Sequence, residues 1–103
     1  MSKEKLLERA RRRFKTVDIE GDTFTVSEMS AATFSLYGET VKTQREEAHA
    51  VLLQDCVVDG QGLKLLTIEE ARDVARSARI VLPLVTAIME VSGLSAEEKP
   101  NAS

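Results

Sequence analysis

The residues best suited to chemistry are a single histidine, His49, and a single cysteine, Cys56. A general base or a zinc site could use them, but a protein-only zinc site would need Asp and Glu to supply the other ligands. The two residues stand seven positions apart, about two turns of a helix, so His49 is too far away to activate the Cys56 thiol. We therefore expect His49 on the flank of a helix and Cys56 as a small core residue.

The acidic residues and glycines do not indicate catalysis either. Adjacent glutamates occur at positions 46–47, 69–70 and 97–98. Neighbours in a helix point about 100° apart, so these pairs are not suited to acid–base work. The glycines form none of the spaced patterns that bind phosphate. The sequence predicts a non-enzymatic protein with no metal and no cofactor.

One concentrated cluster of charge is present, made of Arg9, Arg11, Arg12 and Arg13. It could contact nucleic acid or an acidic protein. No aromatic side chains are interleaved for base stacking, and the net charge of the chain is −3, which opposes phosphate binding. Residues 1–13 hold few apolar side chains, so we predict a flexible basic arm, either a frayed helix or a loose segment. A small cytoplasmic regulator that binds nucleic acid through this cluster is the alternative function.

The composition is that of one small globular domain. The chain has 103 residues, 43% apolar and 30% charged, and only 4% aromatic, so its core must be aliphatic. A lone cysteine excludes an internal disulfide framework, and the N-terminus lacks the apolar core of a signal peptide. No uninterrupted apolar run reaches the roughly 20 residues that span a bilayer. We expect a soluble protein of the cytoplasm.

Apolar residues at alternate positions predict a β-hairpin over 14–26. Val17 and Ile19 alternate with polar residues, as do Phe24 and Val26. A two-residue type II′ turn at 21–22 would set Ile19 opposite Phe24 and Val17 opposite Val26, all on one face. Because an isolated hairpin is marginal in water, this face must rest on helices.

The helical pattern occupies residues 28–94 and predicts four or so helices. Ser27 or Ser30 can cap the first, and a further one covers roughly 43–57; residues 31–57 form either one bent helix or two. Glycines in 59–62 mark the strongest break, and Thr67 with Glu70 forms a capping box. Pro83 predicts either a break near 76–77 or a kink in the last helix. That helix ends near Val91, with Gly93 and Leu94 forming a Schellman motif. The fold class is mainly α (α+β), with the globular domain at 14–94 and a polar tail at 95–103.

The last helix carries more apolar side chains than one core-facing stripe needs. One stripe comprises Ala78, Val81 or Leu82, Val85, and Ile88 or Met89; Ile80, Leu84 and Val91 form a second. A domain this small has few elements to cover both, so an exposed stripe would need a partner. The helix is therefore either a plain core helix or one that also binds a protein. The candidate contact residues are Ile80, Leu84, Ile88 and Val91.

Most of residues 12–101 resembles the tail assembly chaperones of siphophages. The opening "RRRFKTVDIEGDTFTV" with "SEMSAA" is similar to the strand pair and helix start of that family, and "CVVDGQGLKLLTIEEARDVA" is similar to its central turn and acidic helix start. The most distinctive likeness is the ending after the last apolar helix, which comprises Ser92, Gly93, Leu94, Glu97, Glu98, Lys99 and Asn101.

The resemblance implies a protein of the infected bacterial cytoplasm that is absent from the finished virion. Such proteins bind the tape measure protein, recruit tail tube subunits and hold both soluble until the tail polymerises. Many also exist in a longer form made by ribosomal frameshifting, of which this chain would be the short form. Self-association into a homo-oligomer that coats the tape measure would suit this role.

Overall fold

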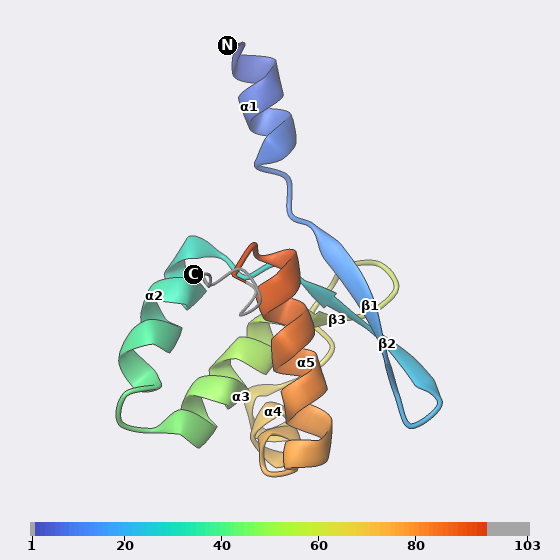
Figure 1. Ribbon diagram of the computed structural model, residues 1–103, viewed down its shortest axis with the longest axis vertical. Helices are drawn as coiled ribbons and strands as arrows, with labels where there is room; N and C mark the ends of the chain where they lie inside the picture. The colour runs from blue at the N-terminus through green and yellow to red at the C-terminus, as the bar shows by residue number, and fades with distance from the viewer. Residues whose placement is uncertain (1, 95–103) are drawn as a thin grey trace, which may run out of the picture.

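The structure is a computed structural model and describes residues 2–94, so the polar tail predicted at 95–103 lies outside the described residues. A three-stranded antiparallel sheet with the order β1-β2-β3 accompanies five helices in this part of the chain. The predicted fold class, a hairpin followed by a small helical bundle, is confirmed (Figure 1).

The hairpin consists of β1 (Phe14–Ile19) and β2 (Asp22–Ser27), joined by Glu20 and Gly21. Both joining residues have positive φ, 54° and 91°, as a type I′ turn requires. The predicted type II′ turn at 21–22 is therefore wrong, because the turn lies one residue earlier. The pairing of the strands is shifted by two residues, so that Val17 pairs with Phe24, and Ile19 with Asp22. A shift of two preserves the side-chain alternation, so the four predicted apolar residues still share one face.

The third strand, β3 (Val57–Val58), was not predicted. It pairs with β2 through Val26 and Val57, and Lys64 adds an isolated bridge to Val58. Between Val58 and Lys64 the backbone turns at the break that the sequence predicted. There the Asp59 carboxylate accepts hydrogen bonds from the backbone N–H groups of Gln61 and Leu63. The sequence did not predict β3 because a strand of two valines is too short to show the alternation of apolar and polar residues.

Residues 31–57 form two helices. The first, α2 (Ala31–Thr40), is capped by Ser30, whose hydroxyl accepts from the Thr33 N–H. The second, α3 (Arg45–Cys56), begins after a turn at 41–44. Ser27, the alternative cap, instead ends β2 with its hydroxyl buried.

The capping box at Thr67 is confirmed at the start of α4 (Ile68–Ala75). The chain breaks at Arg76 and Ser77, as one of the two alternatives predicted, and α5 (Ala78–Val91) then runs through Pro83. The Schellman motif is also confirmed. Gly93 has φ +79°, and the Leu94 N–H donates to the Met89 carbonyl at 2.7 Å.

The core lies between the sheet and the helices α3, α4 and α5. Figure 1 shows α5 lying along the hairpin on one side and beside α3 on the other. The largest fully buried side chains include Leu52 and Leu53 of α3, Ile88 of α5 and Val26 of β2. The first helix, α1 (Lys3–Arg9), projects away from this body and buries none of its residues (Figure 1).

Candidate functional site

The last helix is anchored in the core by one side. Val81, Leu84, Ala87 and Ile88 of α5 are buried. One flank of α5 is polar along the hairpin, where Glu90 forms an ion pair with Lys15 and Arg79 forms one with Glu20. These exposed pairs contribute little to stability, but they are consistent with α5 lying along β1.

The predicted contact residues of α5 are divided by this packing. Leu84 and Ile88 are 4% and 0% exposed and belong to the hydrophobic core, where α5 packs against the sheet and α3. Ile80 and Val91 are half-buried. Of the expected second stripe only Leu84 is buried, so a partner could reach Ile80 and Val91 in part, but Leu84 and Ile88 only if the domain opened.

The more exposed apolar surface of α5 belongs to the first stripe, the one that contains Leu82 and Val85. Leu82 is 55% exposed and lines an open groove of about 430 Å³ together with Ala78 and Val81. Val85 and Met89, half-buried, continue the stripe along α5. The sequence pattern had placed these residues on one face, but it could not show which face the sheet would cover.

His49 lies at this groove, half-buried on the flank of α3 as expected. Its ring stacks on that of Tyr37 with the centroids 6.2 Å apart. Burial, together with the nearby positive charge of Arg45, lowers the pKa of His49 below its ordinary value. The imidazole is therefore neutral at pH 7 and acts as a packing surface.

Cys56 is fully buried at the end of α3. Burial and the neighbouring carboxylate of Asp55 raise the pKa of its thiol to about 12. The thiolate is the nucleophile, and its population at neutral pH is negligible. Across residues 2–94 no three side chains of the metal-binding types cluster together.

The arginine cluster is split by the structure. Arg12 turns toward the body, where its guanidinium donates to the Asp55 carboxylate at 3.1 Å and to the Glu28 carbonyl at 2.9 Å. The Arg13 backbone N–H donates to the Glu28 carboxylate. Arg9, Arg11 and Arg13 are exposed, so three guanidinium groups of the predicted four remain available for an electrostatic contact.

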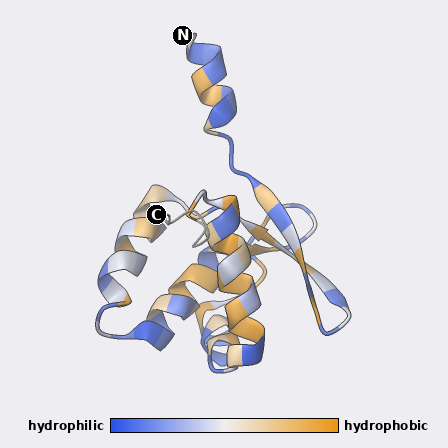
Figure 2. Cartoon of the chain, viewed as in Figure 1, coloured by the Kyte–Doolittle hydropathy of each residue, from blue (hydrophilic) through white to orange (hydrophobic). Residues whose placement is uncertain are grey.

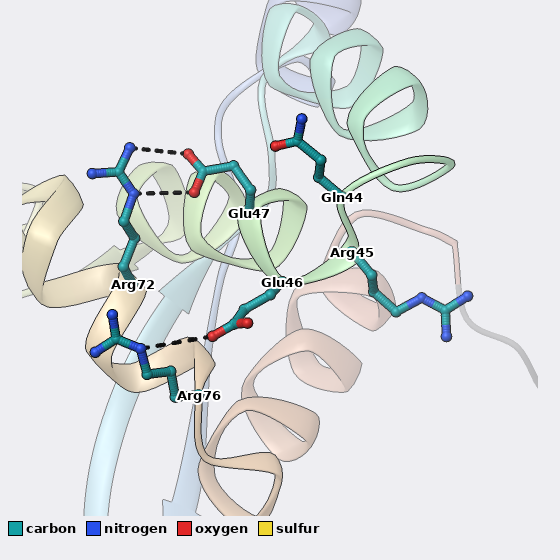
Figure 3. Close-up of a pocket in the computed structure, with 6 residues that line it drawn as sticks. All are labelled: Gln44, Arg45, Glu46, Glu47, Arg72 and Arg76. Atoms are coloured by element: carbon teal, nitrogen blue, oxygen red, sulfur yellow. Dashed lines mark hydrogen bonds and ion pairs between the residues drawn. The ribbon is translucent and has the colours of Figure 1, made fainter.

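A second pocket, of about 450 Å³, lies at the start of α3 (Figure 3) and is lined by charged groups. Arg72 donates two hydrogen bonds to the Glu47 carboxylate, at 3.0 and 3.1 Å, and Arg76 lies 3.8 Å from Glu46. These contacts join α3 to α4, and both glutamates of the pocket are paired with an arginine of α4 or its end. Among the described residues no helix is long and apolar enough to cross a membrane.

Comparison with known proteins gives a match in structure and none in sequence families. No protein-family model matches the chain, and no curated protein matches it. Among solved structures, the tail assembly chaperone of bacteriophage HK97 matches with a TM-score of 0.59 and 25% sequence identity. The match covers 82% of this chain and 89% of that one. This likeness supports a general role in phage tail assembly, and it confirms the resemblance to the phage tail assembly chaperones that the sequence predicted.

Proposed function

We propose that this protein is a non-enzymatic chaperone that binds the tape measure protein and the tail tube protein and keeps them soluble during tail assembly. The observation that carries the proposal is the match to the HK97 chaperone over most of both chains. The groove at the start of α5, lined by Ala78, Val81 and the exposed Leu82, also supports it. An exposed apolar patch is typical of a surface that binds another protein. Half-buried Ile80 and Val91 are the more accessible of the four α5 residues predicted to touch a partner.

The proposal also includes where the protein acts and what its segments do. It acts in the host cytoplasm and is absent from the mature virion, and a frameshifted product would extend beyond the polar tail at 95–103. Residues 1–13 act as a basic arm on the globular domain at 14–94. Binding of nucleic acid through the arm is disfavoured, since the net charge of the chain is −3 and one of the four arginines, Arg12, is paired with Asp55.

Co-expression with the tape measure and tail tube proteins of the same phage tests the function. We expect both proteins to shift from the insoluble to the soluble fraction and to be retained on a tagged copy of this chain. A Leu63→Glu variant serves as a control and should retain both proteins as the wild type does, because Leu63 is 62% exposed and lies outside α5. Failure to retain or solubilise either protein would contradict the proposal. Salt-sensitive DNA binding that is lost when Arg9, Arg11 and Arg13 become alanine would favour the regulator instead.

A further inference from the structure

A third pocket lies on the face of the sheet that points away from α5. Its volume is about 340 Å³, and it is lined by Phe14 of β1, Thr25 of β2 and the turn at residues 59–62. Side chains alternate between the two faces of a strand, so Phe14 and Thr25 lie on the opposite face from Ile19 and Val26, which belong to the core. Figure 2 shows hydrophobic and hydrophilic residues alternating along the hairpin. The pocket is therefore separate from the groove on α5.

One wall of the pocket is the aromatic ring of Phe14. This large apolar side chain is 51% exposed. The end of the ring meets the turn at Gly62, where a Cβ atom would lie 3.4 Å from Phe14 Cζ. Gly62 has φ +83°, a backbone conformation that glycine adopts without strain. The rest of the ring borders the pocket and is open to a ligand.

The turn contributes the charge of the pocket, through Asp59. Its carboxylate is half-buried, and the Oδ1 atom accepts hydrogen bonds from the backbone N–H groups of Gln61 and Leu63 at 2.8 and 3.0 Å. These two bonds fix the orientation of the carboxylate. Within residues 2–94 Asp59 forms no ion pair, in contrast to Asp55, which is paired with Arg12 and Lys64. The Oδ2 atom of Asp59 is therefore available to a cation.

A guanidinium group fits these walls. It stacks on aromatic rings and pairs with carboxylates, and its planar shape allows it to do both at once. An anion would be repelled by Asp59, and a purely apolar side chain would leave the Asp59 carboxylate and the Thr25 hydroxyl without partners. A metal ion would need more ligands, and no three side chains of the metal-binding types cluster in the described residues.

The charge of the surrounding domain also favours a basic partner. Residues 14–94 contain thirteen acidic and seven basic side chains. A protein segment that carries arginine is attracted to such a surface, and the attraction speeds association. The proposed function requires the chain to bind two different proteins, and the groove on α5 is one surface. The pocket on the other face of the sheet offers a second.

We propose that the pocket between Phe14 and Asp59 binds an arginine side chain of one of the two tail proteins. The guanidinium group lies against the Phe14 ring and pairs with the Asp59 carboxylate, beside the Thr25 hydroxyl. That the arginine comes from a tail protein rests on the proposed function, whereas the chemistry of the pocket rests on its own lining. The contact lets one chain hold a second protein while the groove on α5 is occupied.

Titration of the isotope-labelled chain with N-acetyl-arginine amide, followed by NMR, tests the chemistry of the pocket. We expect the backbone amide signals of Thr25 and residues 60–62 to shift. N-acetyl-citrulline amide has nearly the same shape without the charge and should bind at least about threefold more weakly. Equal binding of the two compounds, or shifts confined to other parts of the chain, would overturn the proposal.

Two substitutions test the two walls separately. Asp59→Asn removes the charge but keeps an oxygen that can accept both hydrogen bonds of the turn, and Phe14→Leu removes the ring but keeps an apolar side chain. Each should weaken binding of the arginine compound by about three- to fivefold. Asp22→Asn is the matched control, because it removes an equal charge from the exposed start of β2 and should bind as the wild type does. Urea denaturation should show all three variants folded, and unchanged binding by Asp59→Asn would overturn the proposal.

Co-expression with the tape measure and tail tube proteins tests the source of the arginine. We expect Asp59→Asn and Phe14→Leu to lower the retention of one of the two proteins, and Asp22→Asn to retain both. If the wild type retains neither protein, the proposed function fails, and the titration still decides whether the pocket binds arginine. If the wild type and Asp59→Asn retain both equally, the function stands and the pocket proposal is overturned. A change in the sedimentation of purified Asp59→Asn, with retention unchanged, would assign the pocket to a second copy of the chain and also overturn it.

Discussion

At the scale of single residues, Asp55 connects three segments that are distant in the sequence. Its carboxylate accepts a hydrogen bond from Arg12 of the arm and one from the Ser30 N–H at the cap of α2, and it lies 3.8 Å from the Lys64 ammonium. The Asp55 side chain is only 11% exposed. The sequence could not predict this arrangement, because Arg12 stands 43 positions away and its neighbours suggested a solvated arm.

Replacing Asp55 by asparagine should lower the free energy of unfolding by about 1–3 kcal/mol, because the carboxylate's charged hydrogen bonds are lost in a largely buried place. Urea denaturation at pH 7 measures this loss. Glu47→Gln is a matched control, since it removes another ion pair with an arginine on the exposed surface and should cost far less. Equal losses in the two variants would contradict the structural role of Asp55.

The same carboxylate should make stability depend on pH. Burial raises the pKa of Asp55, but hydrogen bonds from Thr33, Arg12 and the Ser30 N–H, with the charge of Arg12, outweigh it and leave the pKa below its ordinary value. The unfolded carboxyl therefore takes up its proton at higher pH than the folded one. The stabilisation is complete at neutral pH and is lost as the pH falls below about 4 through the folded pKa.

Urea denaturation of the wild type and Asp55→Asn between pH 7 and pH 3 checks this dependence. The difference in unfolding free energy between the two proteins should narrow at acid pH. The pKa of Glu47 is also lowered, by its hydrogen bond with Arg72, but this contribution is common to both proteins and cancels. A difference that stays constant over this range would show that the Asp55 charge does not stabilise the fold.

At the scale of elements, local chemistry predicted the helix ends better than the strand pairing. The capping box of Thr67 and the Schellman motif at Gly93 depend on residues three to five positions apart, so the sequence contains the whole motif. The register of the hairpin instead depends on which two residues occupy the central positions of the turn. Glycine at position 21 suits either turn type, and only the structure showed that Glu20 also adopts positive φ. The pairing of β3 with β2 joins segments about 30 residues apart and had no local signal.

Glu20→Asn should stabilise the hairpin. Glu20 has φ 54°, which costs a non-glycine residue about 1 kcal/mol, whereas asparagine tolerates this region and Asn-Gly is a preferred type I′ pair. We expect a gain in unfolding free energy of up to about 1 kcal/mol, measured by thermal or urea denaturation. Glu20→Gln is the control, because it removes the same ion pair with Arg79 without relieving the backbone. A type II′ turn at 21–22 would leave both variants without a gain.

At the scale of the whole molecule, α5 both closes the core and borders the groove. The sequence showed two apolar stripes on this helix, but the choice of the buried one depends on where the hairpin and α3 pack. The structure buries Leu84 and leaves Leu82 exposed, two positions apart on the same helix. Stability thus rests on the buried side of α5, and the side that carries Leu82 is the one that we propose for binding another protein.

Two matched leucine substitutions should separate these roles. Leu84→Ala should lower the free energy of unfolding by about 2–5 kcal/mol, because it removes buried methyl groups and leaves a cavity. Since a small domain has a total of only about 5–15 kcal/mol, this loss should be visible as a large drop in the melting temperature. Leu82→Ala should change stability by less than about 0.5 kcal/mol and should instead weaken the retention of the tape measure and tail tube proteins in the co-expression test. Equal destabilisation by both substitutions would mean that the two stripes share one core, and that neither is free for a partner.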